Sequence, residues 1–151
     1  MKKLIKSSIV ALALCAPVML MATNATADEW PLVGGDFWEV TGVSLKDGGG
    51  LAYANFLTTE WRQNQEFAKS KGWIKNYFIL GNSYPRKGEP DLYLISVTER
   101  LATGPEGDKR SDEYTAWRQK TLVQMVKENG DRAEIREILS DSLLQELKFR
   151  K

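Results

Sequence analysis

A chain of 151 residues has room for one domain with a single hydrophobic core. Its 21 basic and 20 acidic residues are interspersed, which excludes nucleic acid and anionic membrane surfaces as expected partners. One cysteine and no histidine leave almost none of the side chains that dominate zinc, copper and haem ligation. We therefore expect no metal and no cofactor, and any acid–base chemistry would fall to Glu, Asp, Lys or Tyr.

Residues 1–27 have the pattern of a Sec signal peptide. Three lysines precede an apolar segment over 9–22, and Ala25-Thr26-Ala27 fits the small-x-small cleavage pattern. We expect cleavage after Ala27, export to the periplasm, and one mature domain over 28–151. Cleavage would also remove Cys15, so no disulfide is expected. No later segment reaches ~20 uncharged apolar residues, so stable membrane insertion is not expected.

The mature chain is predicted to begin with a leading segment over 28–36 and a strand over 37–45. The apolar residues of this strand change parity at Gly42, which indicates a bulge or a close backbone approach there. Residues 46–50 form a glycine-rich turn that leads into the first helix.

The first helix is predicted between the glycine turn and Gly72, which is well placed as a left-handed cap. At ~100° per residue its apolar side chains share one wide, aromatic face. Glu60 and Asn64 also lie near the middle of that face, one turn apart. A carboxylate and an amide there are either satisfied core polar groups or the wall of a pocket.

Strands are predicted over 73–80 and 91–97, separated by a loop over 81–90 that is rich in turn-forming residues. The strand over 91–97 is apolar on both faces, with Leu92 and Leu94 on one and Tyr93, Ile95 and Val97 on the other. Because a sheet with helices on one side normally has a polar second face, we infer that something covers it.

A polar loop over 102–110 leads to a second helix over 111–129 and a short third helix over 131–139. Residues 140–142 break that helix, and 143–149 are predicted as a last strand, with a longer helix as the alternative. The inner face of the second helix has Arg118 near its middle. Its other inward residues are Tyr114, Trp117, Thr121, Leu122 and Met125.

The predicted order is β-α-β-β-α-β, the ferredoxin-like α+β arrangement with an antiparallel sheet. A weak internal repeat supports this order. Asp36-Phe37-Trp38 and Asp91-Leu92-Tyr93 each open a strand, and the helices that follow begin with Tyr53-x-x-Phe56 and Tyr114-x-x-Trp117.

Several loose motifs extend over nearly the whole mature chain: Trp38-x-Val40, Tyr53-x-x-Phe56-Leu57, Gly88-Glu89-Pro90-Asp91-Leu92-Tyr93-Leu94 and Leu143-Leu144-x-Glu146-Leu147. With them the chain resembles dimeric α/β-barrel proteins, in particular small exported bacterial ones of unassigned function. The resemblance implies a homodimer in which two sheets pack face to face. This packing would cover the second apolar face of the strand over 91–97.

Active members of that superfamily include cofactor-independent monooxygenases, haem-degrading enzymes and small isomerases or cyclases, which place a pocket between the helices and the sheet. The resemblance implies that Glu60, Asn64, Trp61 and Arg118 face such a pocket. The haem branch relies on a histidine ligand, and this chain has no histidine.

Two interpretations of these residues stay open. Glu60 either forms a structural ion pair with Arg118 or acts as a general base or ligand anchor, with Asn64 as a hydrogen-bond donor and Arg118 holding an anionic substrate. The aromatic residues Tyr53, Trp61, Tyr114 and Trp117 are either core and interface residues or a ligand cage.

Three functions follow from these interpretations. The protein either binds a small apolar or anionic ligand without catalysis, or is a cofactor-independent oxygenase or isomerase using Glu60 and Asn64, or is a purely structural interaction protein. A closed, dry space with Glu60 paired to Arg118 would favour the last. An open apolar pocket with Glu60 unpaired would favour the first two.

Overall fold

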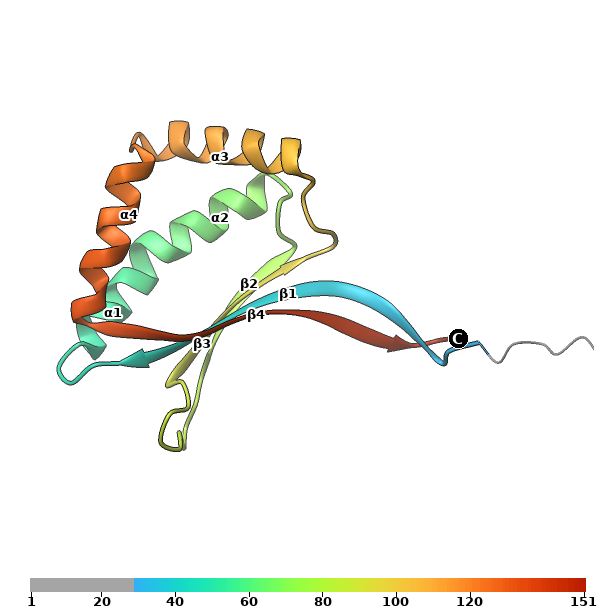
Figure 1. The fold of residues 1–151 in the computed structure, drawn as a ribbon, viewed down its shortest axis with the longest axis horizontal. Helices are drawn as coiled ribbons and strands as arrows, with labels where there is room; N and C mark the ends of the chain where they lie inside the picture. Colours follow the sequence, from blue (N-terminus) through green and yellow to red (C-terminus); the bar gives the residue numbers. More distant parts are fainter. Residues whose placement is uncertain (1–28) are drawn as a thin grey trace, which may run out of the picture.

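A computed structural model describes residues 29–151, so the predicted signal peptide lies outside the described residues. The domain combines one sheet with helices that all lie on one side of it (Figure 1). The elements are, in order, β1 (Leu32–Leu45), α1 (Gly50–Phe56), a π turn (Leu57–Trp61), α2 (Arg62–Ser70), β2 (Asn76–Gly81), β3 (Leu92–Thr98), α3 (Gly104–Arg118), α4 (Leu122–Asp131), a 3-10 turn (Arg132–Glu134) and β4 (Arg136–Phe149).

The four strands form one sheet in the order β2-β3-β1-β4, and every neighbouring pair is antiparallel. The predicted α+β class and antiparallel sheet are therefore confirmed. The strand order, with the first helix between β1 and β2 and two helices between β3 and β4, is compatible with the ferredoxin-like arrangement.

The core lies between the sheet and the first helix, which comprises α1, the π turn and α2. Val43 of β1 and Leu94 of β3 meet Tyr53 and Leu57 of the helix, and Tyr53 is only 1% exposed. The partly buried side chains around them are Leu45, Phe56, Trp61, Leu92 and Ile135.

The opposite face of the sheet is also apolar, as predicted for β3. In the antiparallel register Trp38 pairs with Val97 and Val40 with Ile95, so these side chains share the face that points away from the helices. Trp38 also packs edge-on against Phe78 of β2, with ring centroids 5.3 Å apart. Within residues 29–151 no helix covers this face (Figure 1).

The prediction for the first helix is confirmed at its C-terminal end. Gly72 has a φ of +69°, and the N–H of Trp73 donates to the carbonyl of Ala68 over 2.9 Å, which closes the cap. The π turn was not predicted. The hydroxyls of Thr58 and Thr59 donate to the carbonyls of Ala54 and Asn55 around it, at 3.0 and 2.7 Å.

The second half of the chain corrects two predictions. Residues 104–110 are helical rather than a loop, since α3 begins directly after Thr103 with a proline in its first turn. The predicted single helix over 111–129 is interrupted at Gln119, which has a φ of 53°. A capping box between Thr121 and Gln124 then starts α4.

The predicted third helix over 131–139 is wrong, because only a 3-10 turn precedes the long strand β4. Residues 140–142 belong to that strand and do not interrupt a helix. The predicted strand over 143–149 is therefore confirmed, although β4 begins earlier, at Arg136. The expected irregularity at Gly42 is confirmed. The β1–β4 register shifts after it, and a Cβ there would meet Ser140 and the ring of Pro90.

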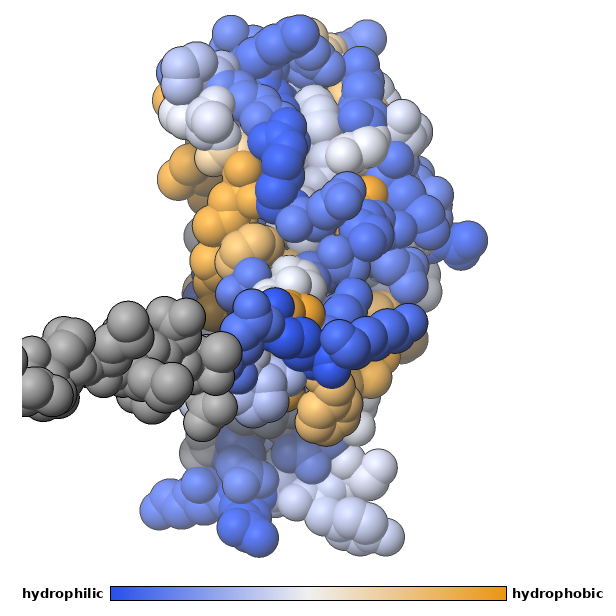
Figure 2. Space-filling model, turned by 90° about the vertical axis from the view of Figure 1, so that its right-hand side faces the viewer, coloured by the Kyte–Doolittle hydropathy of each residue, from blue (hydrophilic) through white to orange (hydrophobic). Residues whose placement is uncertain are grey.

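The predicted leading segment over 28–36 is largely strand. Leu32 pairs with Phe149 and Gly34 with Leu147, and since β1 pairs with β3 only from Phe37 onward, these residues form a two-stranded ribbon that projects from the sheet (Figure 1). Phe149 is 86% exposed at its end. Viewed from this end, apolar side chains gather on both flanks of a mostly hydrophilic surface (Figure 2).

Candidate functional site

Two pockets flank the first helix, and neighbouring helix residues face different ones. Glu60 and Asn64 line an interhelical pocket between the first helix and the α3–α4 pair. Trp61 and Gln65 line a trough between α2 and the sheet. The prediction that Glu60 and Trp61 face one pocket is therefore wrong. Consecutive helix residues point ~100° apart, so a single wide face can border two pockets, with Glu60 and Asn64 on one side and Trp61 and Gln65 on the other.

The interhelical pocket has a volume of about 330 Å³. Four of the seven predicted site residues converge on it, namely Glu60, Asn64, Tyr114 and Arg118. The remaining wall comes from the end of α1, from α4 and from the turn after it: Phe56, Leu122, Met125, Val126, Glu128, Asn129 and Arg132.

Arg118 is the centre of the polar contacts in this pocket. Its Nη2 donates to Glu60 Oε2 over 2.7 Å, and its Nη1 donates to Asn64 Oδ1 over 3.1 Å. The Arg118 side chain is 11% exposed and that of Glu60 is 41% exposed. A second carboxylate, Glu128, lies 3.8 Å from Nη2 and is itself bound by Lys120. Glu60 and Asn64 therefore hold the guanidinium in one orientation.

Burial and the neighbouring charges shift the pKa values of two groups in this pocket, Tyr114 and Glu128. Burial raises the pKa of the Tyr114 hydroxyl above its ordinary value, although the nearby Arg118 opposes the shift. The hydrogen bond from Lys120 lowers the pKa of Glu128, which keeps that carboxylate charged. Tyr114 is thus a neutral hydroxyl beside charged groups at neutral pH.

The other three predicted ligand-binding residues lie elsewhere. Tyr53 of α1 is buried in the core. Trp61 packs edge-on against Tyr77 of β2, with centroids 5.4 Å apart. Trp117 stacks on Phe67 with centroids 4.3 Å apart; it is 40% exposed and lies outside the interhelical pocket, where it lines a separate hollow with Glu60 and Arg118. Their positions fit the core and packing interpretation of these aromatic residues.

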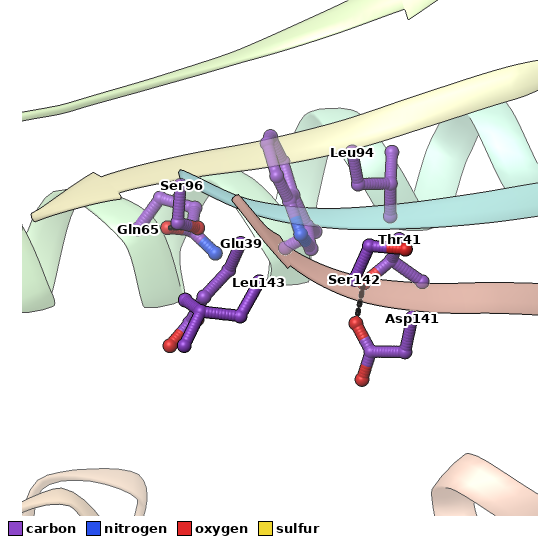
Figure 3. Close-up of a pocket in the computed structure, with 9 residues that line it drawn as sticks. Glu39, Thr41, Gln65, Leu94, Ser96, Asp141, Ser142 and Leu143 are labelled. Atoms are coloured by element: carbon purple, nitrogen blue, oxygen red, sulfur yellow. Dashed lines mark hydrogen bonds between the residues drawn. The ribbon is translucent and has the colours of Figure 1, made fainter. Parts of the chain in front are cut away.

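The trough has a volume of about 500 Å³, and its polar residues were not predicted. In Figure 3 the side chains of Glu39 and Leu143 extend together from the sheet, and Thr41 donates to Asp141 over 3.1 Å. Ser96 donates to Gln65 of α2 over 3.0 Å. Glu39 could have been noticed, because it lies at the same parity as Phe37 and Thr41 in a predicted strand.

A smaller cavity of about 230 Å³ shares Glu39 and Ser96 with the trough. It ends at Arg100 and Arg110, whose guanidinium groups both donate to Glu106. The trough side of the helix therefore combines two carboxylates from the sheet with arginines that are already paired.

Within the described residues no three His, Cys, Asp or Glu side chains lie together as a metal site. None of the helices in this part of the chain has the length and apolar character to cross a membrane. Comparison with protein-family models, with curated proteins and with solved structures gives no match. The resemblance to dimeric α/β-barrel proteins therefore stays a prediction.

Proposed function

We propose that this is an exported, periplasmic protein that binds a small, partly apolar ligand in the interhelical pocket without converting it. The observation that carries the proposal is the convergence of Glu60, Asn64, Tyr114 and Arg118, from separate segments of the chain, on one pocket. Its volume of about 330 Å³ lies at the lower end of the range of small-molecule sites.

The apolar part of the proposed site comes from α4. Leu122, Met125 and Val126 line the pocket, and Val126 is 71% exposed. Exposed apolar side chains at a pocket mouth gain about 25 cal/mol for each Å² that a ligand removes from water. A ligand with an apolar body would therefore be stabilised against this helix.

The open pocket favours a ligand, whereas the pairing of Glu60 with Arg118 is the feature expected of a structural interaction protein. Between binding and catalysis, the pairing of Glu60 favours binding. A general base must reach the proton that it removes, whereas this carboxylate accepts a hydrogen bond from Arg118. Asn64 accepts from the same guanidinium, so both residues position Arg118. The alternative, a cofactor-independent oxygenase or isomerase, predicts turnover that disappears in Glu60→Gln while folding stays intact.

The proposal includes a ferredoxin-like homodimer in which the uncovered sheet faces meet. Leu80 of β2 and Leu144 of β4 share this face with Trp38 and are 51% and 54% exposed, so in a monomer apolar side chains would lie against water there. The projecting ribbon adds an exposed Phe149, and a two-stranded ribbon alone is marginally stable in water. A second copy would cover both, whereas a structural interaction protein would cover them with a different partner.

Native mass spectrometry of the protein purified from its own periplasm tests both parts together. We expect a dimer that retains a small molecule at low collision energy, and release of that molecule in Arg118→Met. A monomer at micromolar concentration would contradict the homodimer. A ligand retained equally by Arg118→Met would contradict the interhelical site.

A further inference from the structure

We propose that the ligand of the interhelical pocket is a carboxylate with an apolar body, and that Arg132 binds its carboxylate group. This inference rests on the proposed function and adds the chemical class of the ligand. It is carried by the hydrogen bonds and charges of the arginines at the pocket.

Arg132 lies at the pocket wall with most of its donors unused. Its guanidinium lies 4.2 Å from the ring centroid of Phe56, which fixes its plane. Its one hydrogen bond is to Asn129 Oδ1, at a long 3.4 Å. Among residues 29–151 it forms no ion pair with a carboxylate, and its buried Nε has no hydrogen-bond partner. Arg132 is therefore a held cation with hydrogen-bond donors available to an anion.

Arg118, on the other side of the same pocket, is already occupied. It contacts Glu60, Asn64 and Glu128. Its role is to complete the polar wall, and a ligand carboxylate would have to compete with Glu60 for it. Arg132 is consequently the arginine of this pocket that is available to bind an anion.

A second arginine increases the positive charge behind Arg132. Arg136 is only 8% exposed, and in the described chain it too forms no ion pair with a carboxylate. Its Nη2 donates to Asn129 Oδ1 over 2.6 Å, so both guanidinium groups are bound to one neutral oxygen. A carboxylate close to Arg132 in its pocket, Glu128, forms its own ion pair with Lys120. Two adjacent buried or half-buried guanidinium groups that form no ion pair of their own are unfavourable, and an anion at Arg132 would relieve this.

The apolar wall determines the remainder of the ligand. Leu122, Met125 and Val126 of α4 line the same pocket as Arg132, so a carboxylate at the guanidinium places its chain against them. A short aliphatic or arylalkyl carboxylate satisfies both requirements. A small inorganic anion would leave the apolar wall exposed, and a neutral apolar molecule would leave Arg132 without a partner.

Isothermal titration calorimetry with octanoate and octanamide at neutral pH and low ionic strength tests the inference. In the wild-type protein we expect octanoate to bind at least about tenfold more tightly than octanamide. Arg132→Gln should weaken octanoate binding by about tenfold and leave octanamide binding unchanged. Lys127→Gln is the matched control, because Lys127 is an exposed α4 cation paired with Asp131, outside the pocket.

The outcomes separate this inference from the proposed function. Equal binding of octanoate and octanamide, or equal loss of octanoate binding in Arg132→Gln and Lys127→Gln, would contradict a carboxylate-binding role for Arg132. The interhelical pocket would remain the proposed ligand site. Binding of neither compound would overturn both. If Arg132→Gln fails to fold by circular dichroism, Arg132→Lys serves instead, since it keeps the charge but loses the planar fork. That variant should bind octanoate several-fold more weakly than the wild type while still preferring the acid, and unchanged octanoate affinity would overturn the role of Arg132.

Discussion

The two pockets on either side of the first helix differ in the charges that line them: the interhelical pocket carries both signs, because Glu60 and Glu128 line it beside two arginines, whereas the charged residues of the trough are carboxylates. In the interhelical pocket, α3 contributes Arg118 and the turn after α4 contributes Arg132. In the trough, the sheet contributes Glu39 and Asp141. The helix contributes an uncharged amide to each, Asn64 on one side and Gln65 on the other. The first helix and the elements opposite it both contribute charge to the interhelical pocket, and consecutive helix residues serve two chemically distinct sites.

If the pockets are independent, a large change on the trough side should leave the interhelical pocket working. We expect Trp61→Ala to destabilise the protein by about 2–3 kcal/mol, since it removes a partly buried indole that packs against Tyr77 and the core. Urea unfolding measures this loss. Octanoate affinity, measured below the unfolding transition, should stay within about threefold. Lost binding in a folded variant would contradict independent pockets.

A change in the polar wall of the interhelical pocket should lower the stability of the fold, in addition to the loss of ligand expected for Arg118→Met. We expect Arg118→Met to cost about 1–3 kcal/mol, because Glu60 and Asn64 lose their common partner in a partly buried site. Adding Glu60→Gln should restore part of that loss in urea unfolding, since the unpaired carboxylate is removed. Lys127→Met, which breaks an exposed pair on α4, should change stability by less than about 0.5 kcal/mol.

Helix α4 lines the interhelical pocket but not the trough, so weakening its N-terminal cap should affect only one of the two pockets. We expect Thr121→Ala to cost about 1 kcal/mol, because it removes the side-chain cap on the N–H of Gln124. Amide hydrogen exchange should accelerate in the first turn of α4 and not in α2. Thr121→Ser, which keeps the hydroxyl, should retain the protection. Equal acceleration in α2 would indicate that the two helices unfold as one unit.

The smallest expected effect is in the pH dependence on the trough side. Hydrogen bonds from Arg100 and then Arg110 lower the pKa of Glu106 from 4.5 to about 2. The pKa is depressed on folding, so the stabilisation is present above pH 4.5 and is lost as the pH falls toward 2. In Glu106→Gln, the acid-induced decrease in the unfolding midpoint over this interval should be smaller. An identical pH profile would contradict the pairing in solution.

The first half of the fold was largely predictable because its signals are local. A short run of apolar residues on both faces marks β3, and Gly72 marks the end of the first helix. The errors in the second half have local causes too. The interruption at Gln119 has no glycine signal, and the capping box at Thr121 lay inside what looked like one continuous helical face.

The interhelical pocket was partly predictable, because Glu60, Asn64 and Arg118 are polar residues at inward helical positions. Arg132 and Asn129 were missed, since their places depend on where α4 ends and β4 begins. The trough was missed because Asp141 belongs to a region predicted to break a helix. Finally, the ~100° between consecutive helix residues already separates Glu60 from Trp61, so one wide face borders two pockets; the π turn, which the sequence period does not reveal, shifts the residues after it relative to those before it.

An NMR titration of backbone amides with octanoate tests most directly the central claim, that the interhelical pocket is the ligand site. We predict saturable shifts at Asn64, Tyr114 and Arg118, with Ser96 and Asp141 in the trough unchanged. Shifts confined to the trough residues, or no saturable shift at Arg118, would contradict the account.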